Sequence, residues 1–413
     1  MKKTISIALA YVGVIVGAGF ASGQEILQYF VSFGAVKGIL ALALAAFLFV
    51  TTGKFLLELG SLYNAKGHDQ VINNLLPKPL AAVLDISFIV GNFGIGLVMI
   101  AGAGSNINQQ FGLPIFVGSI IMGILIILAG FLNTEKVTQV IGTITPFLVV
   151  FFLVVAVYAL LNIKISPDEM NAIAINKVST TLPNWWMAAM NYVTFNLMTG
   201  VSMAIVMGGD ELNPLPAGRG GFWGSTIISV LLLFSAGAMF SQIDLIYASD
   251  LPMLELVNQT HPILGTVMSV VILGMIFNTG LGMFYAVTSR LVKDNQKKFR
   301  ITIILLVAAA FVLSFAGFKN LVAYLYPAIG YVGIVLLCVT YYGWFKHRSD
   351  IKDAIITRNR MTEIALKGEE ATIEEKKEYE KLISDAFTDR QTLDEAVKQN
   401  VYRIQRSKNA SVK

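Results

Sequence analysis

The residues best placed to do chemistry lie near the N-terminus, in the stretch VGVIVGAGFASGQEI from Val12 to Ile26. The stretch is apolar enough for a membrane helix, yet it contains repeated glycines and a polar group: Gly13, Gly17, Gly19, Gly23, Ser22, Gln24 and Glu25. Glycine readily adopts non-helical conformations, so a helix can unwind here and expose main-chain groups to a ligand. Unpaired peptide groups are costly in lipid, so such a break must face protein or a watery cavity. The stretch therefore predicts a binding cavity.

Close helix packing is the alternative interpretation of these glycines, because they form two G-x-x-x-G patterns. Packing leaves the polar side chains unexplained, whereas a broken helix accounts for both features. A second stretch, MNYVTFNLMTGVSMAIVMGGDE, places similar residues at mid-span: Asn196, Thr199, Gly200 and Ser202. We expect both helices to be interrupted, near residues 16–23 and 196–203.

The composition requires a membrane protein with many spans. Of 413 residues, 55% are hydrophobic and 14% are charged, and apolar runs of about 20 residues recur along the chain. This pattern favours an all-α polytopic protein over a barrel. A signal peptide is the alternative for the first segment, but its apolar run continues and further spans follow, so we interpret it as a retained helix.

The hydropathy predicts ten transmembrane helices, at 4–34, 37–63, 80–109, 114–133, 137–162, 185–208, 220–243, 262–291, 299–316 and 320–346. Basic residues of the short loops gather on the side of the N-terminus and the tail, whereas the opposite loops carry Lys37, Lys164, Lys177 and Lys319. This bias predicts that both termini are cytoplasmic, in a multi-pass protein of the cell membrane.

An internal repeat relates the third and eighth helices. The third contains GNFGIG with Asn92, and the eighth contains FNTGLG with Asn278; both read N-x-G-x-G and both follow a loop that ends in proline. An offset of five helices makes the second copy enter the membrane from the opposite side. The sequence therefore predicts a 5+5 inverted repeat, with repeat one at about 1–162 and repeat two at about 185–346.

Residues 347–413 form a charged tail beyond the transmembrane domain of residues 1–346. TIEE at Thr372–Glu375 and TLDE at Thr392–Glu395 resemble capping boxes and predict short helices. The tail is either a solvated cytoplasmic appendage or a regulatory or partner-docking element.

The IVGAGFASGQE stretch, the ten helices and the tail resemble the YkvI-type amino-acid permeases, a family of the amino acid–polyamine–organocation superfamily. Gly17-Ala18-Gly19 is similar to that superfamily's glycine-rich break in helix one. The resemblance covers residues 1–346 and implies the leucine-transporter fold with broken helices one and six. It also implies a secondary transporter for an amino acid.

Two broken helices suit a zwitterionic ligand, because exposed N–H groups attract its carboxylate and exposed carbonyls attract its ammonium. The predicted substrate contacts are the main chain of helix one and the facing residues of helix six: Gly17, Ala18, Gly19, Ala21, Ser22, Asn196, Thr199, Gly200 and Ser202. Asn92 either completes this pocket or bonds between helices.

The family resemblance also implies a sodium site between helices one and eight. By position, its ligands would be the carbonyls of Gly13, Val16 and Met275 and the side chains of Asn278 and Thr279. Five oxygens suit a hard cation. Asn278 departs from the expected serine or threonine, and this departure weakens the sodium assignment.

A proton is the alternative coupling ion. Carboxylates within membrane spans are rare and functional by default, and Glu25 beside the break is the strongest candidate. Glu58 is expected to pair with Lys54, four residues earlier, and Asp85 to be hydrated near the start of helix three. We expect water to hydrate Glu25 as well, and this expectation favours sodium, with Thr279→Ala abolishing sodium dependence and Glu25→Gln preserving it.

Other function classes find less support. Cys338 stands alone, the three histidines are far apart, and no H-E-x-x-H, Ser–His or Cys–His pattern indicates an enzyme. A membrane sensor on a transporter-like scaffold remains the alternative. We expect a small solute and the lipid bilayer as partners, no nucleic acid, and no cofactor beyond the coupling ion.

Overall fold

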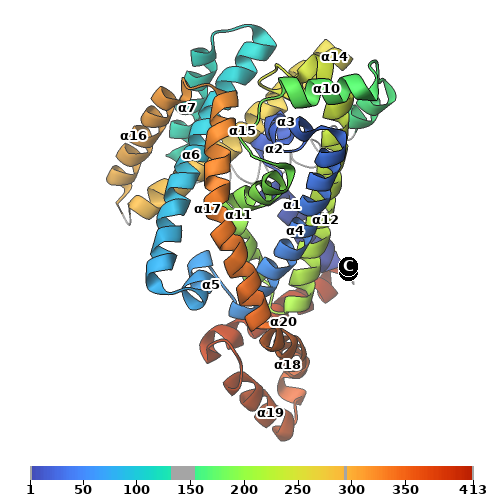
Figure 1. The fold of residues 1–413 in the computed structure, drawn as a ribbon. Coiled ribbons are helices and arrows are strands. Elements are labelled where there is room, and N and C mark those ends of the chain that lie inside the picture. The colour runs from blue at the N-terminus through green and yellow to red at the C-terminus, as the bar shows by residue number, and fades with distance from the viewer. Residues whose placement is uncertain (1, 132–153, 293–294, 412–413) are drawn as a thin grey trace.

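The computed structural model describes residues 2–131, 154–292 and 295–411, and every regular element among them is a helix (Figure 1). Six described segments are long and apolar enough to cross a membrane: Gln24–Tyr63, Lys78–Phe111, Trp185–Gly209, Pro214–Ser241, Pro262–Leu291 and Phe318–Lys346. The protein is therefore an all-helical polytopic membrane protein, as its composition predicts.

The first predicted span is interrupted twice. It consists of α1 (Lys2–Ile15), α2 (Ala18–Ser22) and α3 (Gln24–Tyr29), and a short 3-10 turn, η1 (Val31–Phe33), leads into the long helix α4 (Gly34–Tyr63). The interruption near residues 16–23 agrees with the sequence-based expectation.

The rest of the first half contains one short helix before the third span. The elements are α5 (His68–Leu75), α6 (Lys78–Phe111), α7 (Ile115–Gly130) and α10 (Pro167–Lys177). The segment expected to be a loop before the third span thus contains α5. Most of the fifth predicted span lies outside the described residues, and residues 154–161 of it are helical.

The second half follows the predicted spans closely. Its elements are α11 (Trp185–Gly209), α12 (Pro214–Ser241), α13 (Ile243–Ile246), α14 (Pro252–Thr260), α15 (Pro262–Leu291), α16 (Gln296–Ser314) and α17 (Phe318–Lys346). α12 begins earlier than expected because Asn213 caps it, accepting the Leu215 N–H at 2.9 Å, and proline fits its first turn.

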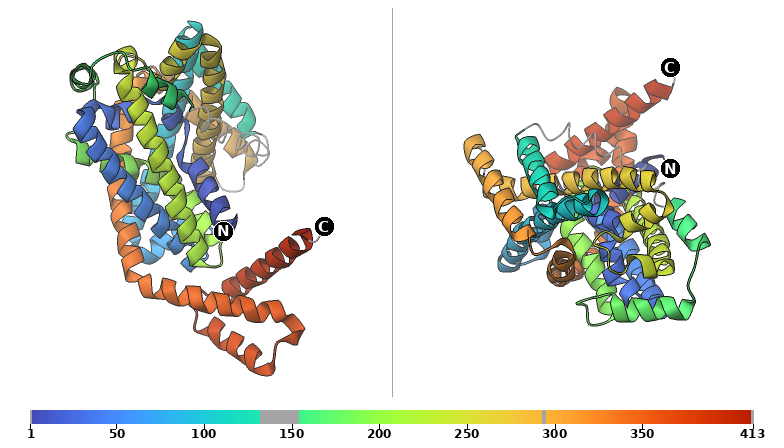
Figure 2. Two further views of the ribbon diagram at one scale, coloured as in Figure 1. Left: turned by 90° about the vertical axis from the view of Figure 1, so that its right-hand side faces the viewer. Right: turned by 90° about the horizontal axis from the view of Figure 1, so that it is seen from above.

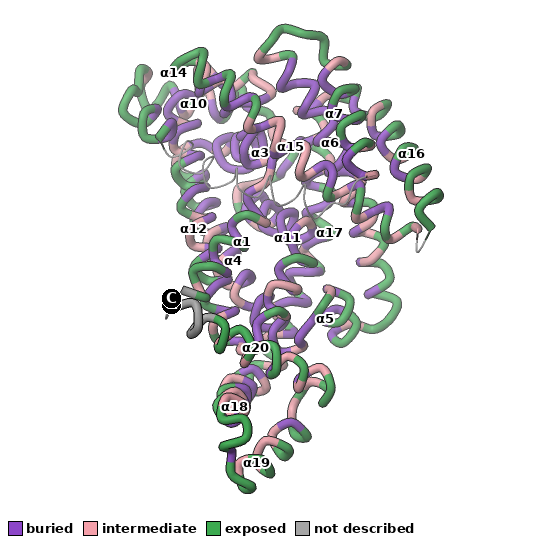
Figure 3. Tube along the Cα trace, turned by 180° about the vertical axis from the view of Figure 1, so that it is seen from behind, coloured by how far each residue is buried: buried purple, intermediate pink, exposed green. Residues whose placement is uncertain are grey.

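The helices pack into one bundle (Figures 1 and 2). α4 packs against α11 and α12, α1 packs against α12 and α11, and α6 packs against α15, α7, α16 and α17. Large apolar side chains remain exposed on the outer faces of the bundle, among them Val36, Val83, Leu128 and Leu305, and Figure 3 shows the exposed outer segments in green. Such a surface suits lipid contact.

The C-terminal tail forms three helices at one end of the bundle, which we call the tail end (Figure 2). These are α18 (Arg348–Lys367), α19 (Ile373–Ser384) and α20 (Arg390–Ser411). The expected capping box at Thr372 and Glu375 opens α19. The one expected at Thr392 is wrong: Asp389 caps α20 by accepting the Thr392 N–H at 3.0 Å, so Thr392 lies inside the helix.

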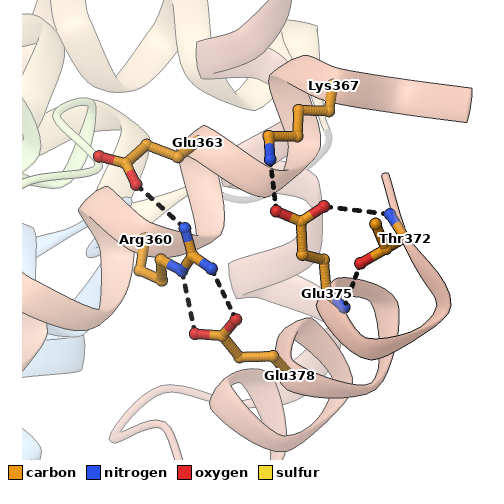
Figure 4. A network of polar contacts seen from close by, with 6 residues as sticks. All are labelled: Arg360, Glu363, Lys367, Thr372, Glu375 and Glu378. Carbon is orange, nitrogen blue, oxygen red and sulfur yellow. Dashed lines mark hydrogen bonds and ion pairs between the residues drawn. The ribbon is translucent and has the colours of Figure 1, made fainter. Parts of the chain in front are cut away.

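Ion pairs hold α18 and α19 together (Figure 4). Arg360 donates two hydrogen bonds to the Glu378 carboxylate, at 2.9 and 2.8 Å, and a third to Glu363 at 3.4 Å. Lys367 pairs with Glu375, the residue that completes the capping box. The tail is therefore a structured helical element.

Candidate functional site

The first break in the first span frees main-chain groups between α1 and α2. The Val16 N–H still donates to Val12, but the Gly17 N–H donates to the Ile15 carbonyl at 2.9 Å. In a continuous helix the Gly17 N–H would donate to the Gly13 carbonyl. The break therefore takes the usual hydrogen-bond donor away from the Gly13 carbonyl. Gly13 is exposed, and nothing lies within 4 Å of where its Cβ would be.

The second break lies at Gly23, between α2 and α3. Gly23 has φ +79°, a left-handed conformation that glycine adopts without strain, and a Cβ there would meet Met239 and Met253. The Ser22 hydroxyl donates to the Gly19 carbonyl at 2.7 Å and accepts the Gln24 N–H at 3.2 Å. Ser22 therefore stabilises this break within the chain itself.

Glu25 is buried beside the break and belongs to a polar cluster with α11. It is 3% exposed, and its Oε1 accepts a hydrogen bond from the Tyr192 hydroxyl at 3.0 Å. No ion pair involves Glu25 among the described residues. A Cβ on Gly19 would clash with Glu25 Oε2, so glycine makes room for the carboxyl group. The expectation that water hydrates Glu25 is wrong, because α2 and α11 cover it.

The cluster around Glu25 continues to α17. The Tyr29 hydroxyl donates to Asn191 Oδ1 at 3.1 Å, and the Asn191 amide donates to the Pro327 carbonyl at 2.9 Å. Pro327 has no N–H to donate to the Ala323 carbonyl one turn earlier, and the Thr181 hydroxyl donates to that carbonyl instead, while Asn191 adds a bond between α11 and α17 at the Pro327 carbonyl. Tyr29, Asn191 and Tyr192 are residues that the sequence reasoning missed, since hydroxyl and amide groups on apolar helices carry no spacing signal.

The start of α2 approaches α15 where the sodium site is predicted. A Cβ on Gly17 would lie 3.7 Å from the Thr279 hydroxyl oxygen. Val16, Ala18, Ala21 and Met275 are buried in the core of the bundle. The structure therefore brings the helix-one break and Thr279 together. The half-buried side chains of Asn278 and Asn92 have no hydrogen-bond partner among the described residues.

The expected interruption of the sixth span is wrong, because α11 runs without a break from Trp185 to Gly209. Asn196 and Thr199 donate to carbonyls of their own helix, at Tyr192 and Asn196, both at 2.8 Å. Gly200 is a packing position, since a Cβ there would lie 2.9 Å from Ile15 Cδ1. These residues stabilise α11 as a continuous helix packed against α1. For α11, helix packing therefore explains the glycine and the polar residues, and a break does not.

Ser202 lies away from the break, in a polar cluster at the tail end. Its hydroxyl contacts His68 Nδ1 at 2.6 Å, while Arg290 donates to His68 Nε2 at 2.7 Å and to Asp85 at 3.3 Å. Burial, and then the Arg290 charge, lower the pKa of the His68 imidazole. Because Arg290 donates to Nε2, the neutral ring donates from Nδ1 to Ser202. The Asp85 side chain is 46% exposed, so it is hydrated as expected, but it also pairs with Arg290.

The expected Lys54–Glu58 pair is present, with Nζ and Oε1 at 4.0 Å, and the Trp344 indole donates to Glu58 Oε2 at 2.6 Å. Glycines of the repeated motif are close-packing positions: a Cβ on Gly96 would meet Phe284, and one on Gly280 would meet Met99. Glu58 and these glycines are thus structural.

Gln24 is a further candidate that the sequence reasoning left out. Its side chain is fully buried directly after Gly23, and neither Oε1 nor Nε2 has a hydrogen-bond partner. A buried amide without partners costs free energy, so Gln24 is a candidate contact for a ligand. Its position in the polar group after the glycines was the signal that could have identified it.

Comparison with known proteins supports a transporter scaffold. No protein-family model matches the sequence. The uncharacterized membrane protein YkvI of Bacillus subtilis (strain 168) is 23% identical over 335 residues, which cover 80% of this chain and 93% of YkvI. The chain is a YkvI-like membrane protein.

Solved structures show the fold of this YkvI-like protein. MhsT in complex with L-phenylalanine matches with a TM-score of 0.57 at 15% identity, covering 96% of this chain and 97% of MhsT. A mutant of the manganese transporter of Eremococcus coleocola matches with a TM-score of 0.54 at 13% identity, covering 97% and 94%. The YkvI-like chain therefore has the leucine-transporter fold.

Proposed function

We propose that this chain is a secondary transporter that moves a small zwitterionic solute, an amino acid, by alternating access. The observation that carries the proposal is the doubly broken first span, which places the unpartnered amide of Gln24 and the carboxyl group of Glu25 in the protein interior. Such breaks bind substrates and ions in transporters of this architecture. MhsT, a protein of the same fold, binds L-phenylalanine.

The substrate would contact the break itself. The main chain of Gly17, Ala18, Gly19 and Ala21 forms the break; the Gly17 and Ala21 N–H groups already bond to the Ile15 and Gly17 carbonyls, and the Gln24 amide supplies an unpartnered donor and acceptor. A divalent metal is a poorer cargo, although the manganese transporter shares the fold. No group of three His, Cys, Asp or Glu side chains that could hold a metal ion occurs within residues 2–131, 154–292 and 295–411.

A proton bound at Glu25 is the coupling ion that the geometry favours. Burying an ionised carboxylate without a cation is costly, and Glu25 has a phenol as its polar neighbour. Glu25 would therefore carry a proton in the closed state and release it when one side of the cavity opens to water. This proposal reverses the preference for sodium that the sequence alone suggested.

Sodium coupling is the second candidate, and the approach of Gly17 to Thr279 supports it. The diverted Gly13 carbonyl and the Thr279 hydroxyl are hard oxygen ligands of the kind that sodium binds. Val16, Met275 and Asn278 would complete the shell.

Transport in proteoliposomes separates the two coupling ions. With a labelled amino-acid mixture, we expect uptake driven by a pH gradient, at least tenfold lower in Glu25→Gln and unchanged in Thr279→Ala. Uptake that requires sodium, is lost in Thr279→Ala and persists in Glu25→Gln would contradict the proton assignment. Binding of a solute without exchange of labelled for unlabelled solute would instead indicate a sensor.

We further infer that residues 1–162 and 185–346 are inverted repeats, related by a rotation of about 180° about an axis in the membrane plane. Short helices precede corresponding spans, α5 before α6 and α14 before α15. The contacts of α1 with α12 and of α11 with α4 also exchange between the halves. Residues 347–413 would then be a separate unit, and both termini would lie in the cytoplasm. Single cysteines introduced near each terminus in a Cys338→Ser background would test this orientation by labelling from each side of the membrane.

A further inference from the structure

One buried arginine docks the tail onto the bundle. Arg358 of α18 is 2% exposed, and its guanidinium donates to the carbonyls of Ser61, Leu62 and Leu212, each at 2.8 Å. The Thr388 hydroxyl donates to the Leu62 carbonyl as well, at 2.8 Å. These carbonyls lie at the end of α4 and in the turn between α11 and α12. The tail is therefore fixed against the transmembrane helices.

A cavity of about 500 Å³ lies beside this contact. The turn between α4 and α5, α5 itself, the end of α17 and the turn between α19 and α20 line it. Its volume lies in the range of sites for small molecules, which begins at about 300 Å³. The cavity exists because the docked tail covers the end of the bundle, so a molecule bound there would touch both parts.

The charges of the lining favour an anion. Lys66 and Lys346 line the cavity, and neither forms an ion pair with a described carboxylate. Asp389 also lines it and is ionised, because hydrogen bonds from Thr392 hold the pKa of this carboxyl below its ordinary value, but its Oδ1 accepts the Thr392 N–H in the first turn of α20, so two ammonium groups face one carboxylate that is already hydrogen-bonded. The two ammonium groups are therefore available to a ligand.

Asn64 provides an independent indication of a ligand. It is 6% exposed and lines the cavity, yet neither Oδ1 nor Nδ2 of its side chain has a hydrogen-bond partner. Its backbone has φ +46°, so it ends α4 in a left-handed conformation that asparagine tolerates. Buried amides are almost always hydrogen-bonded, so the unpartnered Asn64 amide at the cavity wall is a group to which a bound ligand could supply partners.

We propose that this cavity binds a small phosphate-bearing anion, held by the ammonium groups of Lys66 and Lys346 and by the amide of Asn64. Lysine binds phosphate as a point charge, and phosphate oxygens also accept hydrogen bonds from an amide. The phosphate belongs either to a soluble compound or to a lipid headgroup at the membrane surface. The bound anion would join the tail to α5 and α17. This site is separate from the solute site at the helix-one break.

Thermal unfolding of the purified full chain tests the proposal. We expect inorganic phosphate to raise Tm by about 2–4 °C relative to chloride at equal ionic strength. The double variant Lys66→Gln/Lys346→Gln and the variant Asn64→Gly should lose this response, since glycine keeps the backbone conformation and removes the amide. The charge-matched control Lys297→Gln/Lys298→Gln alters two exposed lysines outside the cavity and should retain it.

Nanodiscs distinguish the source of the phosphate. Stabilisation by phosphatidylglycerol over phosphatidylcholine that disappears in Asn64→Gly, without an effect of inorganic phosphate, would assign the site to a lipid headgroup. Equal responses of the parent chain and both sets of cavity variants, or no response of the parent to either phosphate source, would overturn the proposal. Should Asn64→Gly fail to fold, the lysine variants decide alone.

Discussion

Gly19 makes room for the carboxyl group of Glu25, and this contact is the most sensitive one beside the break. A methyl group at Gly19 would clash with Glu25 Oε2, so we expect Gly19→Ala to move the carboxyl group away from the Tyr192 hydroxyl. The glutamate side chain can rotate, so we expect the variant to fold. Transport measured in proteoliposomes should fall at least tenfold, as for Glu25→Gln.

Gly13→Ala is the matched control for this prediction. Gly13 lies in the same span, but nothing lies within 4 Å of its Cβ position, so the added methyl group meets open space. Transport by Gly13→Ala should stay within about twofold of the parent. Equal losses in the two variants would mean that the glycines matter for helix flexibility and not for the position of Glu25.

Among the elements, α5 connects to α11 and α15 through His68, and this connection should depend on pH. Burial lowers the pKa of His68 in the folded state, so the unfolded chain binds a proton more readily. The stability contributed by the neutral ring is therefore present above the ordinary pKa of about 6.5 and is lost as the pH falls below it. We expect Tm to fall less between pH 7.5 and 5.5 in His68→Gln than in the parent.

His261→Gln provides the control, because His261 is exposed at the start of α15. Its Tm should fall between pH 7.5 and 5.5 as much as that of the parent. If His68→Gln also matches the parent, the buried ring does not titrate in this range and the α5 contact is independent of pH.

Hydropathy predicted most of the long helices but not which of them are interrupted. Apolar runs predicted α4, α6, α11 and α15 nearly to their ends. A helix that crosses the lipid must be apolar over the thickness of the bilayer, and this requirement fixes its length. The break in the first span was predictable because glycine and buried polar groups coincide there. The same combination of glycine and polar residues led to the wrong prediction of a break in α11. Asn196 and Thr199 donate to carbonyls of their own helix, and the sequence alone does not distinguish such bonds from contacts with a ligand.

At the scale of the molecule, the candidate site depends on contacts between distant segments. Tyr192, the hydrogen-bond donor to Glu25, is 167 residues away in the chain, and the burial of Glu25 follows from that contact. Hydropathy places Glu25 in a helix but does not identify the helix that covers it. The docking of the tail could not be predicted from the sequence either, because Arg358 binds main-chain carbonyls, and every residue has such a carbonyl.

The hydrogen bonds of Arg358 should determine whether the tail stays docked on the bundle. Burial lowers the pKa of Arg358 to about 10, so the guanidinium is still charged at neutral pH, and its hydrogen bonds to three carbonyls hold α18 in place. Arg358→Ala removes these bonds; the Ser61 and Leu62 carbonyls keep the Asn64 N–H and the Thr388 hydroxyl as donors, but the Leu212 carbonyl loses its side-chain donor, so we expect a cost of about 1–3 kcal/mol. The tail should therefore detach, and trypsin should cleave it much faster than in the parent, while the transmembrane helices stay folded.

Arg360→Ala is the control two residues further along α18. Arg360 is exposed and pairs with Glu363 and Glu378 inside the tail (Figure 4), so its loss weakens the contact between α18 and α19 but leaves the docking bonds intact. Exposed ion pairs contribute little to stability, so the rate of tail cleavage should stay close to that of the parent. Equal release by both variants would show that the tail is not held by Arg358 but by its own folding and by its other contacts with the bundle, such as the bond from Thr388 to the Leu62 carbonyl.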